Sequence, residues 1–191
     1  MNKPIFRSSY TMLHIWQSGD WEHFVKSYFH LGEQLTTREM SEGKEFHSQW
    51  QKEIEETKCL PKLFGGTQLK DPKCEVKKLV KLEDWLEFVF IADMVDGSDI
   101  HEFKTGVSSS SDWVKTNQIA CYGVGMTFDK HFVDRGFVHH WDQYNKRYDM
   151  SMIWLTDKVL QETQNWIETL SSEAYDYLLT NKLYERFGKR L

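Results

Sequence analysis

Residues 90–106 have the sequence FIADMVDGSDIHEFKTG. Apolar and polar residues alternate on both sides of the Asp-Gly-Ser-Asp segment at 96–99, which predicts two β-strands joined by a tight turn. We expect these strands to cover residues 85–95 and 100–105. Because side chains two positions apart on a strand share a face, Glu102 and Lys104 are expected to point the same way.

The turn leaves two strand registers open. If Gly97-Ser98 forms the loop, Asp93 lies directly opposite Glu102. If Asp96-Gly97 forms it, Asp93 moves by two positions but keeps the face of Glu102 and Lys104. Opposed carboxylates repel each other unless a cation neutralises them. Carboxylate ligands suit Mg²⁺ or Mn²⁺, and a neighbouring lysine can stabilise charge that develops at a phosphate.

The rest of the chain alternates between helical and strand patterns. Helical spacing is expected over 8–29 (broken near Gly19), 37–57 and 113–126, and in a long helix capped by Thr156. Further strands are expected over 75–81, 132–141 and 150–155. This order predicts a mixed α/β fold with a central, largely antiparallel sheet flanked by helices.

We expect one domain over residues 1–191. It would contain an N-terminal helical part (1–60), a catalytic sheet and helix (75–126), and C-terminal strands with the long helix (130–191).

The helix expected over 37–57 carries a stripe at steps of three and four, formed by Met40, Gly43, His47, Trp50 and Ile54. A single histidine on such a stripe is commonly a packed core residue. An inward histidine that accompanies an inward carboxylate pair is instead a candidate metal ligand. In the helix expected over 113–126, Gln118 and Tyr122 are four residues apart and share a face.

Four short motifs follow one another in a fixed order: Gly43-Lys-Glu-Phe-His47, Asp93, Glu102-Phe-Lys104 and Gln118-Ile-Ala-Cys-Tyr122. This order resembles the PD-(D/E)XK nuclease superfamily, specifically its RecB-type, exonuclease-like branch, with GxxxH, D, ExK and QxxxY. The opening Ser9-Tyr-Thr-Met-Leu13 also resembles the start of such domains. The resemblance spans roughly residues 8–126 and implies a restriction-endonuclease-like core.

The resemblance implies a role for each motif residue. His47, Asp93, Glu102 and the carbonyl of Phe103 would hold one or two Mg²⁺ or Mn²⁺ ions. Lys104 would be the catalytic lysine, acting together with Glu102 and Asp93.

On the substrate side, the resemblance implies that Gln118 and Tyr122 line the site toward DNA. The implied activity is metal-dependent hydrolysis of DNA phosphodiester bonds, as an exonuclease on ends or single strands in recombination, repair or replication. Homo-oligomers or a recombination or replication partner protein are compatible with this resemblance.

Composition sets further bounds. The formal net charge of −5 is acidic, but Lys115 and a lysine cluster at 70–81 can supply local positive potential for DNA. Three cysteines, Cys59, Cys74 and Cys121, cannot supply the four ligands of an iron–sulfur cluster, so we expect none. Scattered cysteines favour a reducing cytoplasmic setting, including the host cytoplasm for a phage protein. No apolar run has the roughly 18 residues that a membrane span requires.

Two alternatives remain open at this stage. The chain could be a catalytically silent DNA-binding or assembly module on the same fold, or a protein-interaction factor. The adjacent His139 and His140 are not expected to form a metal pair, because neighbouring strand residues face opposite sides and one of them should be exposed.

Overall fold

The computed structural model describes residues 4–31 and 38–187, and side chains within the second of these ranges from residue 41 onward. Two parts of the expected second helix, Thr37 and the side chain of Met40, lie outside the described residues. The sheet strands are β1 (Phe6–Ser8), β2 (Pro72–Glu83), β3 (Leu86–Asp96), β4 (Asp99–Thr105), β5 (Arg135–Asp142) and β6 (Arg147–Trp154). The helices are α1 (Tyr10–Gln17), α2 (Trp21–Tyr28), α3 (Arg38–Thr57), α4 (Ser110–Val114), α5 (Gln118–Phe128), α6 (Asp157–Thr180) and α7 (Leu183–Phe187), with a 3₁₀ turn at Lys62–Phe64.

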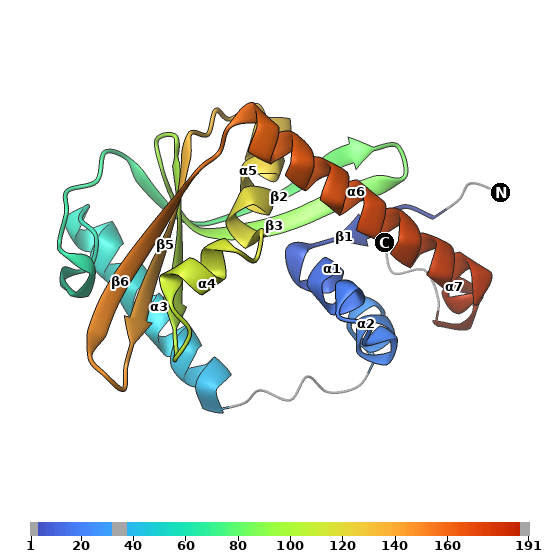
Figure 1. Ribbon diagram of the computed structural model, residues 1–191, viewed down its shortest axis with the longest axis horizontal. Coiled ribbons are helices and arrows are strands. Elements are labelled where there is room, and N and C mark those ends of the chain that lie inside the picture. Colours follow the sequence, from blue (N-terminus) through green and yellow to red (C-terminus); the bar gives the residue numbers. More distant parts are fainter. Residues whose placement is uncertain (1–3, 32–37, 188–191) are drawn as a thin grey trace.

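The strands form one mixed sheet in which three neighbouring pairs are antiparallel and two are parallel. β2–β3, β3–β4 and β5–β6 run antiparallel, whereas β1–β3 and β4–β5 run parallel. Helices cover the sheet on both sides (Figure 1). The predicted mixed α/β fold with helices around a central sheet is therefore confirmed.

β3 is the strand on which the rest of the sheet is built. β2 pairs along its whole length from Leu86 to Asp96, which occupies one edge. The other edge is shared, because β1 pairs at 86–88 and β4 pairs only at 94–96. Since a strand has two edges, residues 89–93 have no strand partner on that second edge within the described part of the chain. Asp93 is the last residue of this gap.

Two hydrophobic clusters hold the helices to the sheet. The larger cluster joins α1, α2, α5, α6 and α7 to one face. The smaller one lies under α3 and includes Trp50, Ile54, Met94 and Phe103. On the larger side, α5 approaches β3 so closely that a Cβ on Gly125 would lie 2.3 Å from Phe90 Cε1. The candidate residues on the sheet, Asp93, Glu102 and Lys104, lie between the helices of these two clusters.

Most predicted helices and strands are present with shifted ends, but one predicted helix was wrong. The helix expected over 113–126 is two helices, α4 and α5. Asn117 separates them with a left-handed backbone (φ 60°) that a continuous helix cannot contain. Ser109 caps α4 in a reciprocal capping box with Asp112, and Thr156 caps α6 as predicted.

β1 and α7 were not predicted. A three-residue strand and a five-residue helix contain too few repeats to show a period. Among the described helices, none combines the length and apolar character needed to cross a lipid bilayer.

Candidate active site

The β3–β4 hairpin adopts the register in which Gly97-Ser98 forms the loop. Its ladder consists of three residue pairs, Asp96–Asp99, Val95–Ile100 and Met94–His101. Beyond them, Asp93 Oδ2 accepts a hydrogen bond of 2.8 Å from the main-chain N–H of Phe103. A side-chain carboxylate thus takes the place that a strand carbonyl would hold. Regular pairing between β3 and β4 therefore stops just before Asp93 and Glu102.

Glu102 lies at the centre of the candidate site on the face of β4 that α5 covers. Its side chain is only 5% exposed, and its Oε1 forms an ion pair with Lys104 Nζ at 2.7 Å. The same oxygen accepts a hydrogen bond of 2.8 Å from Gln118 Nε2. Glu102 Oε2 is buried and has no hydrogen-bond partner among the described residues. A buried carboxylate oxygen without a donor is energetically costly.

The surroundings of Glu102 disfavour a second negative charge. Burial, followed by the negative charge of Asp93, raises the pKa of Glu102 to about 7, and Lys104 offsets only part of this increase. Protonated and ionised forms of the Glu102 carboxyl group are therefore both populated near neutral pH. A cation bound beside Oε2 would favour the ionised form.

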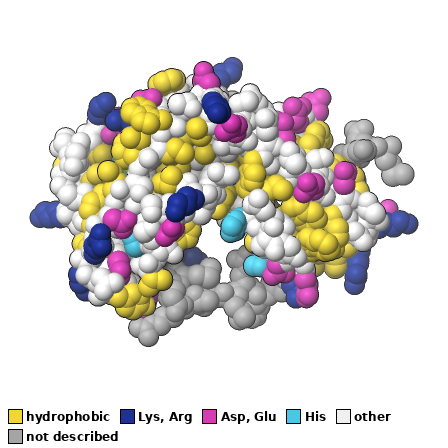
Figure 2. Space-filling view, in the orientation of Figure 1, with side chains coloured by type: hydrophobic (Ala, Val, Ile, Leu, Met, Phe, Trp, Pro, Cys, Tyr) yellow, Lys and Arg dark blue, Asp and Glu magenta, His cyan; other side chains and the backbone are white. Residues whose placement is uncertain are grey.

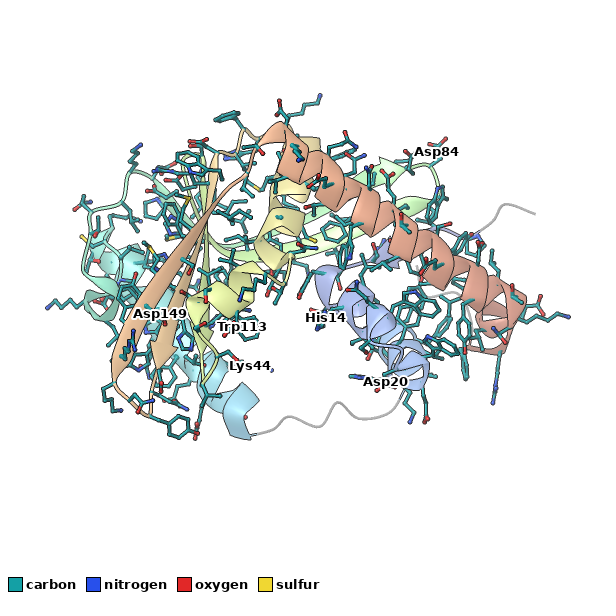
Figure 3. All side chains as sticks on the ribbon, in the orientation of Figure 1. His14, Asp20, Lys44, Asp84, Trp113 and Asp149 are labelled. Carbon is teal, nitrogen blue, oxygen red and sulfur yellow. The ribbon has the colours of Figure 1, made fainter. Side chains whose placement is uncertain are left out.

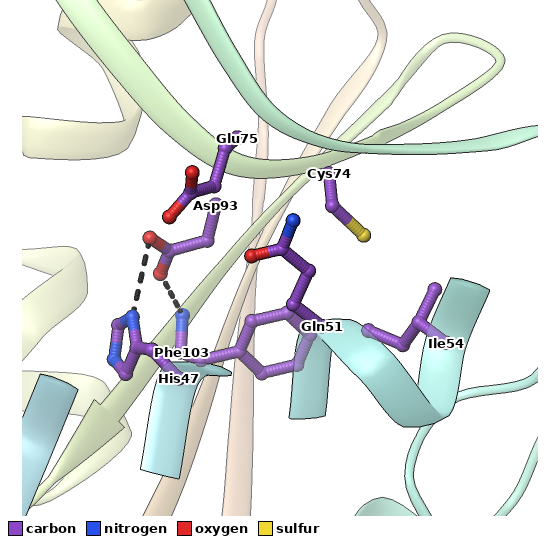
Figure 4. Close-up of a pocket in the computed structure, with 7 residues that line it drawn as sticks. All are labelled: His47, Gln51, Ile54, Cys74, Glu75, Asp93 and Phe103. Carbon is purple, nitrogen blue, oxygen red and sulfur yellow. Dashed lines mark hydrogen bonds and ion pairs between the residues drawn. The ribbon is translucent and has the colours of Figure 1, made fainter. Parts of the chain in front are cut away.

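His47 approaches Asp93 from α3, in the layer on the other side of the sheet. His47 Nδ1 lies 3.4 Å from Asp93 Oδ1. Figure 4 shows both side chains in a pocket that Gln51, Glu75 and other residues line. Burial by itself lowers the pKa of His47, but the hydrogen bond and charge of Asp93, helped by Glu102, outweigh it and the net pKa is raised.

Gln118 and Tyr122 lie one turn apart at the start of α5, as their spacing predicts. Gln118 Nε2 donates to Tyr122 Oη as well as to Glu102, with an N–O distance of 2.6 Å to the hydroxyl. Lys115 stands apart, because it is exposed at the end of α4 and its Nζ lies 3.4 Å from Asp112 Oδ1. The predicted site residues other than Lys115 therefore form two groups in contact, one of His47, Asp93 and Phe103 and one of Glu102, Lys104, Gln118 and Tyr122. The charges of Asp93 and His47 act on Glu102 and link the two groups.

The chemical types of the possible metal ligands in this cluster suit a hard divalent cation. They comprise two carboxylates, an imidazole and the main chain of Phe103, which are ligands that Mg²⁺ and Mn²⁺ accept. The unpartnered Glu102 Oε2 is the atom that such a cation would satisfy. Within the described ranges, no three His, Cys, Asp or Glu side chains are already gathered closely enough to hold an ion. Instead, His47 pairs with Asp93, and Glu102 pairs with Lys104 and Gln118.

The prediction that one of His139 and His140 is exposed was wrong. Both are buried, at 1% and 2% exposure, because β5 is an interior strand with each face covered. His139 Nε2 faces His101 Nδ1 at 2.9 Å, whereas His140 Nδ1 faces Asp149 Oδ1 at 2.8 Å on the other side. The two rings do not form a common site.

Sequence reasoning missed two aromatic residues beside the cluster. The ring of Trp113 lies against Lys104, with Nζ 4.7 Å from the ring centroid. Burial raises the pKa of Tyr10, and the charges of Lys104 and Glu102 also act on it, which places Tyr10 near the site. Trp113 belongs to no motif, and Tyr10 is a variable position inside the opening Ser9-Tyr-Thr-Met-Leu13. The only available signal was the position of Trp113, nine residues after the ExK lysine in the helix expected to follow.

Trp113, which contacts Lys104, borders a hollow in the molecular surface (Figure 3). Figure 2 shows this face hollowed near its centre, with histidine side chains on the wall. In the same orientation, Figure 3 places His14 of α1 on one side of the hollow and Trp113 and Lys44 on the other. Lys104, with a side chain 18% exposed, retains limited access to solvent.

Comparisons with known proteins agree at the level of structure. No protein-family model matches the chain, and no curated protein matches its sequence. A candidate exonuclease from Eubacterium rectale aligns with 90% of this chain and 82% of its own, with a TM-score of 0.60 and 13% identity. The fold is exonuclease-like.

Two further exonuclease structures have the same arrangement. An alkaline exonuclease from Laribacter hongkongensis aligns with 94% of this chain and 94% of its own (TM-score 0.53, 13% identity). A phage-related exonuclease from Haemophilus somnus aligns with 86% of this chain and 82% of its own (TM-score 0.53, 11% identity). At these identities the likeness concerns the exonuclease-like fold, and the chemistry has to be argued from the site.

Proposed function

We propose that this protein is a metal-dependent DNA nuclease that acts as an exonuclease on DNA ends or single strands. The observation that carries the proposal is Glu102 Oε2, a buried carboxylate oxygen without a donor among the described residues, next to the charges of Asp93 and Lys104. A buried oxygen of this kind favours a cationic partner. The exonuclease-like fold supports the same proposal independently.

In this proposal His47, Asp93, Glu102 and the Phe103 carbonyl hold one or two Mg²⁺ or Mn²⁺ ions. When bound, such an ion polarises a phosphate oxygen and makes a nearby water more acidic. Lys104 stabilises negative charge as it develops at the phosphate, because its ammonium is held beside Glu102 rather than free in solvent.

Two residues of α5 support these groups and face the DNA. Gln118 fixes Oε1 of Glu102, leaving Oε2 for the ion. Tyr122, held by the same amide, lines the wall toward the substrate. Lys115, which is exposed outside the cluster, contacts the DNA backbone farther along the strand. Recombination, repair or replication is the setting in which such an activity would serve, with a homo-oligomer or a partner protein as the assembly.

A cleavage assay on end-labelled single-stranded and duplex DNA tests the proposal. The protein is incubated with Mg²⁺, Mn²⁺ or EDTA, alongside Glu102→Ala and Lys104→Met. Glu83→Ala is the matched control, because Glu83 is an exposed strand glutamate that pairs with Leu86, at the opposite end of β3 from Asp93.

We expect metal-dependent degradation that EDTA stops, that both site variants lose and that Glu83→Ala retains. A ladder shortening from one labelled end would identify the exonuclease mode and its polarity. DNA binding without cleavage under any metal would instead favour the catalytically silent module. Cleavage that survives Glu102→Ala would show that the activity lies elsewhere.

A further inference from the structure

We propose that Trp113 is a positioning residue for Lys104, and that a hydrogen-bonded network of His140, Asp149 and Ser110 holds Trp113 in place. The inference rests on the proposed function in one respect, namely that Lys104 is the lysine that acts at the phosphate. The arrangement of the residues themselves can be tested separately.

Lys104 is constrained from two sides. Its Nζ forms the 2.7 Å ion pair with Glu102 Oε1, and it also lies 4.7 Å from the centroid of the Trp113 ring. An ammonium over the face of an indole is attracted by the electron-rich ring. Because a lysine side chain has four rotatable bonds, one partner leaves it several positions, whereas two partners on different sides restrict Nζ to one.

Trp113 is not fixed by a hydrogen bond of its own. Its Nε1 is buried and has no acceptor among the described residues. The position of the ring therefore depends on the main chain of α4 and on packing against the larger cluster. A helix of five residues is not stable by itself, so α4 needs an external anchor.

That anchor is a chain of hydrogen bonds between α4 and the strands β5 and β6. The Ser110 N–H donates to Asp149 Oδ2 at 2.8 Å, and Asp149 Oδ1 lies 2.8 Å from His140 Nδ1. The second ring nitrogen, His140 Nε2, lies 3.1 Å from the carbonyl oxygen of Gly106. Ser110 Oγ also contacts Ser151 Oγ at 2.7 Å.

The network fixes both ends of the segment that carries the chain from Lys104 to Trp113. Gly106 follows β4 directly, and Ser110 is the first residue of α4. His140 connects the two ends through Asp149, and it stands opposite Lys104 in the β4–β5 ladder. His140 is 2% exposed, so water competes little for the contacts of its ring, whereas the Asp149 side chain is 30% exposed. The positions of Lys104 and of the Trp113 ring are thus both set relative to β5.

Steady-state cleavage kinetics provide the first test. Trp113→Leu removes the ring face, and Trp113→Phe retains an aromatic ring. The matched control is Trp154→Leu, since Trp154 is 54% exposed on β6. We expect Trp113→Leu to lower kcat on the order of 10-fold with little change in KM, and Trp113→Phe to restore most of it. The control should behave as wild type.

The anchor is tested in the same assay. Asp149→Ala removes both acceptors of the network, whereas Asp149→Asn keeps an oxygen for the Ser110 N–H. We expect Asp149→Ala to reproduce the loss in kcat and Asp149→Asn to retain most of the activity. Thermal unfolding of each variant is measured alongside, so that a loss through unfolding is separated from a loss through misplacement.

A readout independent of cleavage uses lysines dimethylated with ¹³C-formaldehyde. The ring current of Trp113 should shift the Lys104 methyl signal upfield, and the signal is assigned by its absence in Lys104→Arg. We expect it to return to the position of exposed lysines in Trp113→Leu and in Asp149→Ala. If wild type does not cleave DNA, the proposed function fails, and this signal still decides whether Trp113 holds Lys104.

Three results would overturn the inference. One is a Lys104 methyl signal that does not respond to Trp113→Leu. Another is wild-type kcat in Trp113→Leu while Lys104→Met is inactive. The third is a raised KM with unchanged kcat in Trp113→Leu, which would indicate that Trp113 only binds DNA.

Discussion

The two faces of β4 make an instructive comparison. His101 and Glu102 are adjacent, point to opposite sides of the sheet and are both buried. Each also keeps one side-chain atom without a partner among the described residues, His101 Nε2 on one face and Glu102 Oε2 on the other. By burial and hydrogen bonding alone the two would be equal candidates for a functional group.

Their neighbours differ. His101 stacks between aromatic rings, with Phe137 at 5.0 Å and His139 at 5.2 Å. Burial, with a contribution from the charge of Arg135, lowers the pKa of His101 to about 3, so its ring is neutral. Glu102 instead pairs with Lys104 and lies near the negative charge of Asp93. Its burial, followed by that charge, raises its pKa to about 7. A buried unpartnered atom therefore indicates a site only where charges converge on it.

The largest expected effect comes from removing the charge on the polar face. Glu102→Gln should lower the cleavage rate on the order of 10²- to 10³-fold, because the amide cannot replace a charged ligand. It should also raise the free energy of unfolding in EDTA by about 1 kcal/mol, since the cost of burying the charge and its repulsion with Asp93 both disappear and outweigh the lost ion pair with Lys104. Cleavage rates and chemical denaturation measure the two effects.

His101→Leu is the matched change on the opposite face and should retain most of the cleavage. If His101→Leu lost as much activity as Glu102→Gln, the distinction between the two faces would be invalid.

A smaller effect is expected from Gln118→Ala. The variant removes the donor that holds Glu102 Oε1 but leaves Lys104 in place. Loss of such a supporting hydrogen bond typically costs about 10- to 100-fold in activity. Thr127→Ala, also on α5, serves as the control, because the Thr127 hydroxyl donates to the Gly123 carbonyl of the same helix. Equal kcat in Gln118→Ala and wild type would remove Gln118 from the site.

The last expected effect concerns stability rather than activity, and it is an acid sensitivity of the aromatic face. Burial lowers the pKa of both His101 and His139 to about 3 in the folded protein, below the usual 6.5. As pH falls below 6.5, the histidines of the unfolded chain bind protons before those of the folded protein do. The contribution of the two neutral histidines to the free energy of unfolding is therefore complete above pH 6.5 and is lost as pH falls below it. At pH 5.5 the loss is roughly 1.4 kcal/mol for each histidine.

Glu102 titrates with the opposite sign, so the measurement belongs in the Glu102→Gln background. Denaturation curves between pH 7.5 and 5.5 give the slope of the unfolding free energy. Adding His139→Phe should reduce that slope by about one histidine's share. A slope that does not change would show that the pKa of His139 is not lowered in the folded protein.

The sequence predicted elements more reliably than their junctions. Period-two alternation located β3 and β4, and one turn restricted their register to two choices, of which the structure adopts the first. The break at Asn117 was not predicted, because a single left-handed residue leaves the helical spacing on both sides intact. Likewise, the burial of both His139 and His140 depends on layers that cover β5 from both sides, which no local pattern reports.

For the site, the residue types and their order can be read from the sequence, and local periodicity predicts the faces shared by Glu102 with Lys104 and by Gln118 with Tyr122. That β1 and β4 share one edge of β3 depends on how distant segments pack. Asp93 ends the gap left between these two strands, and His47 of α3 lies 3.4 Å from it. The contact of Trp113 with Lys104 depends on the same packing. Contacts between residues distant in the chain depend on how layers pack, and packing is a property of the whole fold.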